Sequence, residues 1–521
     1  MAVVLDFFVK RYLDQLSDFM EGEIGKVIGV EEEIKKIRDK LSRISPYIQD
    51  AEKKRRTDPV IDSWVKQLKD IMYDVEDILE LCLIKDGRLL AAHPCSCSGV
   101  HSPINLLASC FQRCKFRRDI WNKIKKVNDR LEAIKEVNTL VLGGLVAAQK
   151  NSVTTLSSTS HIFVATDIVG TQIEEAAQNL ISKMENSKKN CSVFGISGMG
   201  GMGKTTLEKK IFGNDEMVKK QFKKQVWLHV SKDYSQIGIL KQALRGIGGH
   251  DDGLQSRAEV EGQIVPLLSE SLLLVLDDIW SADVWMDLLR NVILNGSGRR
   301  VILFTTRHEN VARAMRADFV HHVEKMHEDS GWELIRKIVF GDEEDVIISE
   351  LKEVGMKIVR KCDGLPLAII VIAGVLFHKE KSKRKWKKVV ESKLWSIKEI
   401  DAELSNALYL SYEDLPSHLK QCFLSCAFYR DISFRLDIIP LWLSEGFVIE
   451  QSDNLMENIA EGYYKELIAR NLLQTSQTFI ADYEFVMHDV LRSFGQKLME
   501  EEGIIISGVN HCMNFQRASQ G

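Results

Sequence analysis

Apolar side chains in the first 140 residues recur at alternating intervals of four and three residues. One series runs from Val30 to Ile48, a second from Trp64 to Cys82 and a third from Ile120 to Ile134. This spacing gathers apolar residues on one side of a helix, as in helices that pack into bundles or coiled coils. An apolar segment from Val3 to Met20 adds a fourth helix. The pattern predicts a coiled-coil four-helix bundle over residues 1–140.

The pattern changes after 141–165, a segment rich in Ser, Thr and Gly that we interpret as a linker. Short apolar runs without a polar side then alternate with segments able to form helices, which is typical of a parallel sheet buried on both faces. The runs are CSVFGIS (191–197), QVWLHVS (225–231), LLLVLDD (272–278) and RVILFTT (300–306). Beyond residue 330 the pattern is helical, and 401–500 mixes short helices with weak strands. The expected fold class is therefore multidomain α and α/β.

The composition narrows the class of protein. With 45% apolar and 28% charged residues, the 521-residue chain is typical of globular proteins with a packed core. Its net charge of −4 gives no general attraction to nucleic acid or anionic lipid. Charged residues interrupt the N-terminal segment, and the longest apolar run, 365–377, is too short to span a bilayer. These features predict an intracellular protein.

We predict a loop over residues 86–118, and this loop carries a cluster of Cys and His residues. The residues of this cluster match no standard zinc spacing, so a metal site, acylated thiols and an ordinary cysteine-bearing loop all remain open, the last being favoured. They are His93, Cys95, Cys97, His101, Cys110 and Cys114.

The sequence GMGGMGKTT at 198–206 fits the phosphate-binding pattern G-x-x-x-x-G-K-[ST]. A strand-like run precedes it and a helix-forming run follows, as a phosphate cradle requires. Lys204 is expected to bind the β and γ phosphates, Thr205 to contact Mg²⁺ and Thr206 to lie by the α phosphate. The glycines let backbone N–H groups converge on phosphate oxygens. They are Gly198, Gly200, Gly201 and Gly203.

Two later strand ends carry charged residues that suit the same chemistry. Asp277 is expected to hold Mg²⁺, usually through water, and Asp278 to orient or deprotonate an attacking water. Arg307 is expected to contact the γ phosphate. The alternatives are a solvated turn for the two acids and a surface position for the arginine. No other arginine is recognisable as a catalytic finger, so fast turnover is not indicated.

Eight ordered motifs between residues 166 and 495 resemble the NB-ARC core of plant intracellular immune receptors. They are GMGGMGKTT, VWLHVSKDY, LLLVLDDIW, VILFTTR, GWELIRKIVF, CDGLPLA, CFLSCAFYRD and MHD. The resemblance implies a P-loop domain at 166–320, a helical domain at 321–400, a winged-helix domain at 401–500 and a truncated tail at 501–521. The leucine-rich repeats that such receptors carry are not recognisable in the chain.

The same resemblance assigns further nucleotide contacts. Val169 and Gly170 would pack near the adenine, and Pro366 would close over the base or the phosphates. His488 of the MHD motif would contact the β phosphate of ADP, and Asp489 would hold the local turn.

The N-terminal bundle resembles the coiled-coil, Rx-type domain of these receptors. Its segment YDVEDIL (73–79) matches their acidic motif through Glu76 and Asp77, with an ordinary acidic helix face as the alternative. Two residues depart from the family pattern. Asp6 stands where an apolar residue is expected, and Glu208 stands where a small residue is usual.

The resemblance implies an ADP/ATP-operated switch in plant innate immunity, with Mg²⁺ and at most weak ATPase activity. ADP would hold a closed monomer, and exchange for ATP would open it and lead to self-association. Residues 1–140 would then signal defence and cell death, and would contact other immune receptors or host proteins. The expected location is cytoplasmic, with a membrane contact of the N-terminal helix in the active state.

Three other functions are alternatives: a P-loop ATPase with steady turnover, a DNA-reading regulator, and a partner-binding helper or decoy. The missing arginine finger and the MHD motif speak against the ATPase. Within 457–475 only Lys465 and Arg470 are basic, which speaks against specific nucleic-acid binding.

Overall fold

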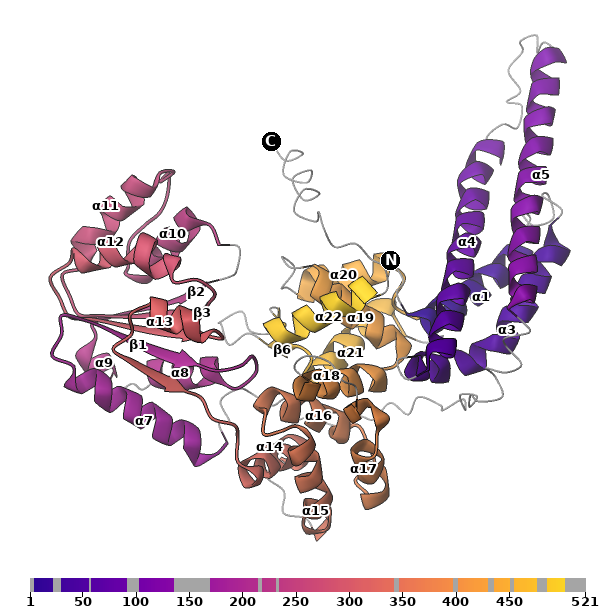
Figure 1. The fold of residues 1–521 in the computed structure, drawn as a ribbon. Coiled ribbons are helices and arrows are strands. Elements are labelled where there is room, and N and C mark those ends of the chain that lie inside the picture. Colours follow the sequence, from indigo (N-terminus) through magenta and orange to yellow (C-terminus); the bar gives the residue numbers. More distant parts are fainter. Residues whose placement is uncertain are drawn as a thin grey trace. The chain divides into compact units, whose positions relative to one another are not determined.

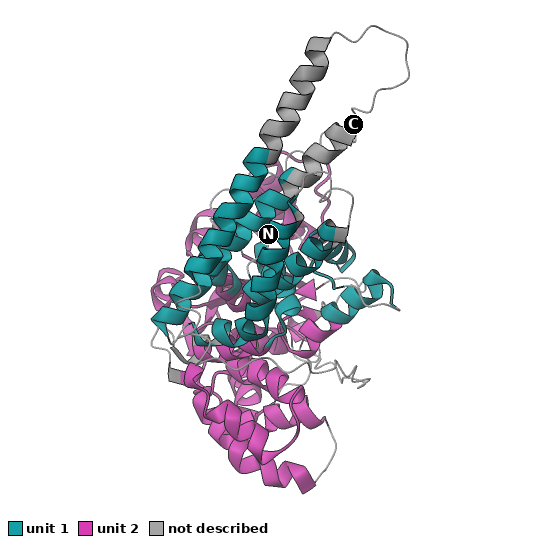
Figure 2. Ribbon diagram, turned by 90° about the vertical axis from the view of Figure 1, so that its right-hand side faces the viewer, with its two compact units in different colours: residues 1–158, 415–464, 495–521 teal, residues 159–414, 465–494 magenta. Residues whose placement is uncertain are grey.

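The computed structural model divides the chain into two compact units, shown in Figure 2. Unit 1 comprises residues 1–158, 415–464 and 495–521, and unit 2 comprises residues 159–414 and 465–494. The five predicted domain boundaries do not coincide with these units and stay predictions. The structure describes residues 4–21, 30–55, 58–90, 103–134, 169–213, 218–230, 234–341, 346–396, 402–429, 435–449, 454–475 and 485–501.

The predicted N-terminal helices are present in unit 1 and pack against one another (Figure 1). Each described side chain of the three predicted apolar series is buried, which confirms the helical interpretation. The helices are α1 (Leu5–Glu21), α3 (Glu31–Lys54), α4 (Pro59–Leu90) and α5 (Pro103–Ala133).

Asp6, the charged residue in the apolar segment, lies inside this bundle with 1% of its surface exposed. Its carboxylate accepts hydrogen bonds from Gln49 Nε2 at 3.0 Å and from Lys10 Nζ at 2.8 Å. Because a buried carboxylate is tolerated where polar groups contact it, these bonds explain how the bundle accommodates the charge.

The prediction of a loop over 86–118 is wrong in part, because α4 continues to Leu90 and α5 begins at Pro103. The polar residues in this region do not interrupt the helices, since a helix needs an apolar stripe only where it packs against another element. The side chains of the Cys and His cluster lie outside the described residues.

Unit 1 also contains α19 (Ser417–Phe428), α20 (Arg435–Ser444) and the first part of α21 (Met456–Ala469). The N-terminal helix contacts this region directly. The rings of Phe7 and Phe447 meet edge to face at 6.2 Å, and Arg11 Nη1 donates to the carbonyl oxygen of Glu445 at 3.1 Å. These contacts bury one side of α1 within unit 1.

Unit 2 is built around a five-stranded parallel sheet with the strand order β2-β3-β4-β1-β5. The four predicted apolar runs are strands. A fifth strand, which the apolar pattern did not predict, lies at the edge of the sheet beside β1. The strands are β1 (Cys191–Ser197), β2 (Lys224–His229), β3 (Leu272–Ile279), β4 (Arg300–Thr306) and β5 (Phe319–His322). All carboxyl ends of a parallel sheet lie at one edge, where ligands commonly bind.

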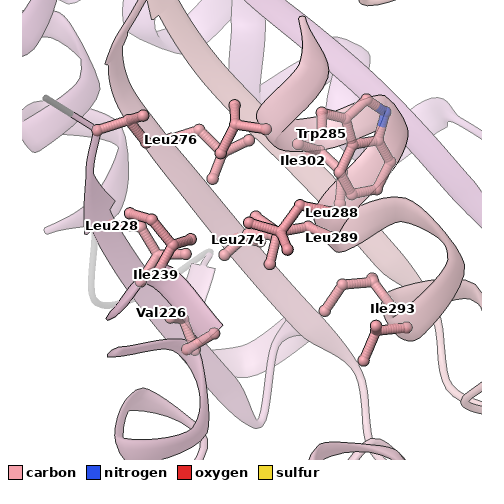
Figure 3. Packing of buried hydrophobic residues seen from close by; sticks show 14 of the residues in the cluster. Val226, Leu228, Ile239, Leu274, Leu276, Trp285, Leu288, Leu289, Ile293 and Ile302 are labelled. Carbon is pink, nitrogen blue, oxygen red and sulfur yellow. The ribbon is translucent and has the colours of Figure 1, made fainter. Parts of the chain in front are cut away.

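Helices cover both faces of this sheet (Figure 1). Leu274 and Leu276 face a core that includes Ile239 and Trp285 (Figure 3). Leu273, between them in β3, faces the opposite core. One side carries α10 (Gln236–Gly246), α11 (Arg257–Leu267), the π-helical turn η1 (Val284–Leu289), α12 (Arg290–Leu294) and α13 (Glu309–Ala314), and the other carries α7 (Thr171–Asn186), α8 (Lys204–Phe212) and α9 (Val218–Gln221).

A group of helices follows the sheet within unit 2, with α16 packed against both α14 and α18. The two-stranded sheet of β6 (Gln474–Thr475) and β7 (Phe485–Val486) precedes α22 (Asp489–Glu501). The helices are α14 (Glu328–Phe340), α15 (Val346–Lys361), α16 (Pro366–Phe377), α17 (Lys383–Val390), the 3-10 turn η2 (Lys393–Ser396) and α18 (Ala402–Asp414). Among the described residues, none of the helices is both long and apolar enough to cross a membrane.

Gly374 in α16 allows the backbone at Arg470 to approach closely. A Cβ at position 374 would lie 2.4 Å from the carbonyl oxygen of Arg470. We expect G374A to destabilise unit 2 by about 1–3 kcal/mol, because backbone atoms must move apart. This would lower the melting temperature by about 2–4 °C per kcal/mol in differential scanning fluorimetry.

The matched control is G262A in α11, where a Cβ would meet nothing within 4 Å. Because alanine favours a helix over glycine by about 0.5–1 kcal/mol, this variant should melt no lower than wild type. Equal melting temperatures for G374A and wild type would contradict the close approach.

Candidate functional site

The glycine-rich loop connects β1 to α8 at the carboxyl edge of the sheet. Gly201 and Gly203 have φ values of 77° and 90°, a backbone conformation that residues with a Cβ atom rarely adopt. Gly203 immediately precedes α8, so the free N–H groups of the first helical turn face the loop. Strand, loop and helix therefore have the arrangement that binds phosphate in P-loop proteins.

Lys204 is buried at the start of α8, and its Nζ donates to the carbonyl oxygen of Met199 at 2.8 Å. Burial lowers the pKa of Lys204 to about 8, against the opposing attraction of Asp278 and with a further lowering by Arg307. An anion beside this ammonium group would favour its charged form. The lysine thus lies where a phosphate would stabilise it.

The carboxylate of Asp277 collects hydroxyl groups from two neighbouring elements. Its Oδ1 accepts from Thr205 Oγ1 at 2.9 Å and from Thr305 Oγ1 at 2.8 Å. Burial raises the pKa of Asp277, but the interaction with His229 and the hydrogen bonds from Thr305 and Thr205 outweigh it and bring the pKa to about 2. Asp277 is therefore ionised at neutral pH.

The oxygen atoms of Thr205 and Asp277 suit Mg²⁺, which prefers oxygen ligands and keeps places for phosphate and water. In the part of the chain that the structure describes, no three Asp, Glu, His or Cys side chains are grouped to hold a metal by themselves. A cation here would consequently share its ligands with a nucleotide.

His229 and Glu208 are neighbours of Asp277 that sequence reasoning did not place in the site. His229 Nδ1 lies 3.6 Å from Asp277 Oδ2, and the interaction with Asp277 is the main cause that raises the pKa of His229. Glu208 is fully buried, and burial followed by the charge of Asp277 raises its pKa well above the usual value. The position of His229 at the carboxyl end of an apolar run was the available signal.

Arg307 binds Asp278 through two parallel hydrogen bonds. Its Nε and Nη2 lie 3.1 Å and 2.9 Å from the two carboxylate oxygens. The guanidinium also lies over the ring of Trp280, 5.0 Å from the centroid. Asp278 has a φ of 54°, unusual for a residue with a side chain. Both oxygens of the predicted catalytic acid are thus engaged by Arg307.

The MHD segment lies beside the same residues, within unit 2. Arg307 Nη2 is 3.4 Å from Asp489 Oδ2, so one guanidinium contacts both Asp278 and Asp489. Burial, then the proximity of Asp278, raises the pKa of Asp489. A Cβ at Gly200 would lie 2.8 Å from Val490 Cγ2, which places the residue after the motif against the glycine-rich loop.

His488 accepts a hydrogen bond at Nδ1 from the backbone N–H of Val490 at 3.2 Å. Burial lowers the pKa of His488 to about 4, and the positive charges of Arg307 and Lys204 contribute. The imidazole is therefore neutral at physiological pH. The contact of His488 with the β phosphate stays a prediction.

The remaining predicted residues lie around the loop or at the start of the nucleotide-binding region. Pro366 begins α16, and the next residue, Leu367, donates its N–H to the carbonyl oxygen of Gly201 at 3.1 Å. Val169 is buried, and Gly170 precedes α7 beside Ser330. Thr206 is half-buried in the first turn of α8, and Gly198 donates its N–H to Thr306.

Three family sequence models match the chain in succession. The Rx N-terminal domain matches residues 8–102, the NB-ARC domain matches residues 169–345, and the winged helix domain of disease resistance proteins matches residues 428–494. The chain thus combines the domains of coiled-coil plant disease resistance proteins. The resemblance inferred from the motifs is confirmed.

The chain belongs to this family and is homologous to the RGA and RPP13 resistance proteins. It is 31% identical over 482 residues to putative disease resistance RPP13-like protein 1 of Arabidopsis thaliana, covering 89% of this chain and 44% of that protein. It is 28% identical over 498 residues to putative disease resistance protein RGA1 of Solanum bulbocastanum, covering 94% and 49%. The chain spans about half the length of these curated relatives.

Among solved structures, the chain is similar to a signal transduction ATPase with numerous domains from Pyrococcus horikoshii, which carries a tetratricopeptide repeat sensor. The identity is 15%, the TM-score is 0.40, and the similarity covers 66% of this chain and 45% of that one. A similarity this low adds nothing to the family assignment.

The lowered pKa of His488 predicts a pH-dependent contribution to stability. Between an ordinary pKa near 6.5 and the folded value of about 4, the unfolded chain binds a proton that the folded chain does not. Stability therefore falls as the pH decreases through this window. Glutamine stays neutral at these pH values. We therefore expect the melting temperature of H488Q to fall less than that of wild type when the pH is lowered from 7 to 5.

The control is H250Q, which replaces an exposed histidine in the same unit and should follow wild type at each pH. Parallel melting curves for H488Q and wild type across this pH range would show that His488 is not buried as a neutral imidazole.

Proposed function

We propose that this chain is an ADP/ATP-operated switch in plant innate immunity. The observation that carries this proposal is that Arg307 contacts both Asp278 at the end of β3 and Asp489 in the MHD motif. One cation in a candidate phosphate site therefore also interacts with the segment expected to report which nucleotide is bound.

The residues around the loop suit both the phosphate end and the adenine end of a nucleoside diphosphate. The N–H groups of Gly198–Thr206 and the ammonium of Lys204 would bind the phosphates, and neutral His488 would donate a hydrogen bond to the β phosphate. Val169, Gly170 and Pro366 would enclose the adenine side. ADP held in this way interacts with both the sheet and the MHD segment, and so favours the arrangement in which they meet.

In this proposal Arg307 is the residue that detects the γ phosphate of ATP. Its guanidinium can bind carboxylates or phosphate oxygens with the same paired geometry. When Arg307 turns to a γ phosphate, Asp489 loses its cationic partner and lies near Asp278 with the repulsion between their charges uncompensated. The MHD segment then separates from the sheet, which is the opening step of the proposed switch.

Thr205 and Asp277 would hold Mg²⁺, whose charge stabilises adjacent phosphates. Asp278 remains the proposed residue that orients a water molecule. Because Arg307 occupies both its oxygens in this arrangement, the closed form is poorly suited to rapid hydrolysis. Slow hydrolysis that resets the switch fits this geometry better than steady turnover.

The later steps of the proposal are supported by family membership. Opening would allow self-association, and residues 1–140 would signal defence and cell death through other receptors or host proteins. We place the protein in the cytoplasm, with its N-terminal helix at the plasma membrane in the active state. Specific nucleic-acid binding is not part of the proposal.

Replacing Lys204 tests the phosphate site. K204R keeps the charge, but the planar guanidinium cannot replace the compact ammonium at a buried position beside Met199. We expect the affinity for fluorescent ADP to fall at least tenfold, measured by anisotropy. K209R, which alters an exposed lysine of the same helix, should bind like wild type. Normal affinity in K204R would reject this role of Lys204.

Replacing Asp489 tests the switch. D489N removes the charge that Arg307 contacts, so the ADP-bound closed form should weaken. We expect gel filtration to show a large assembly with ADP, whereas wild type should assemble only with a non-hydrolysable ATP analogue. D437N changes an exposed acid at the start of α20 and should leave the wild-type profile intact. A D489N protein that stays monomeric with ADP, as wild type does, would contradict the Arg307–Asp489 contact as the restraint.

A further inference from the structure

Glu208 lies in the second turn of α8, three residues after Thr205 and four after Lys204. Side chains at these spacings share one face of a helix, and each leans toward the helix N-terminus. Glu208 thus lies one turn after Lys204, on the helix face that also carries Thr205, which contacts Asp277. Its side chain is fully buried there.

Neither carboxyl oxygen of Glu208 has a hydrogen-bond donor among the described residues. Lys204 Nζ donates to the carbonyl oxygen of Met199, and Thr205 Oγ1 donates to Asp277, so neither of these bonds goes to Glu208. Asp277 is the charged neighbour that contributes most to raising the pKa of Glu208, after burial. Because both acids are buried, a divalent cation between them would compensate two carboxylates at once.

We propose that Glu208 is an additional ligand of the divalent cation at the nucleotide site, contributing a carboxylate oxygen directly or through one water. This inference rests on the proposed function, because the cation would be shared with the phosphates of the bound nucleotide. It assigns a role to a residue for which the family pattern provides none, since a small side chain is usual at this position.

A second carboxylate changes what the site can hold. Thr205 and Asp277 alone offer a hydroxyl and one carboxylate, which suits a Mg²⁺ ion that keeps most of its water. With Glu208 added, two negative oxygens face the cation, and binding releases the proton of Glu208 to solvent. The predicted result is tighter binding of divalent cations to the ADP complex than Asp277 alone would provide.

The experiment uses the full chain loaded with ADP and titrated with Mn²⁺, whose free ion is counted by electron paramagnetic resonance. Binding of fluorescent ADP in excess EDTA is measured first for every protein. E208Q keeps the shape and can still donate a hydrogen bond to Asp277, but its amide is a much weaker cation ligand. E208A places the usual small residue in the helix, and E270Q removes an exposed carboxylate of the same unit as a control.

We expect E208Q and E208A to bind Mn²⁺ about tenfold more weakly than wild type, as for lost residues that support a metal site. ADP binding in EDTA should be unchanged, and E270Q should match wild type. Mn²⁺ affinities within twofold of wild type in both Glu208 variants would overturn the inference and identify a purely structural acid. Failure of wild type to bind ADP in EDTA would instead overturn the proposed function.

Discussion

The interaction on which the candidate site depends is the sharing of Arg307 between Asp278 and Asp489. Asp278 belongs to the end of a sheet strand, whereas Asp489 follows more than two hundred residues later. Removing one member of such a partly buried set leaves a charge without its partner, which is more costly than losing an exposed ion pair. The positions of His488 and Val490 near the glycine-rich loop depend on this contact, because all three residues belong to one short segment.

The charges at the carboxyl edge of the sheet are separated into two zones. Lys204 and Arg307 provide positive charge beside the loop, and the lowered pKa of Lys204 shows that burial there is not fully compensated by the acids. Asp277, which accepts a hydrogen bond from Thr205, and Glu208 provide negative charge, and the charge of Asp277 helps to raise the pKa of Glu208. A metal-bound nucleotide has the opposite distribution, with negative phosphates and a positive ion, and would compensate both zones at once.

Unit 1 constrains the proposed signalling step. Asp6 lies buried within α1, and Phe7 and Arg11 contact residues near Phe447. A membrane contact of α1 would therefore require these contacts to be exchanged for lipid. The charge of Asp6 makes that exchange less favourable than for an apolar residue at the same position, because its bond with Gln49 of α3 would be lost.

Periodic patterns along the chain were sufficient for much of the fold. The series from Val30 to Ile134 predicted the N-terminal helices, and unbroken apolar runs predicted four of the strands, because burial on one side or on both leaves a direct record in neighbouring residues. The glycines and Lys204 identified the phosphate loop for the same reason. The short strand Phe319–His322 was not predicted, because an edge strand of four half-exposed or exposed residues has no unbroken apolar run. The pairing of Arg307 with Asp489 and the burial of Glu208 against Asp277 also escaped, because these contacts arise when distant segments fold together, and local spacing carries no information about which charges will then meet.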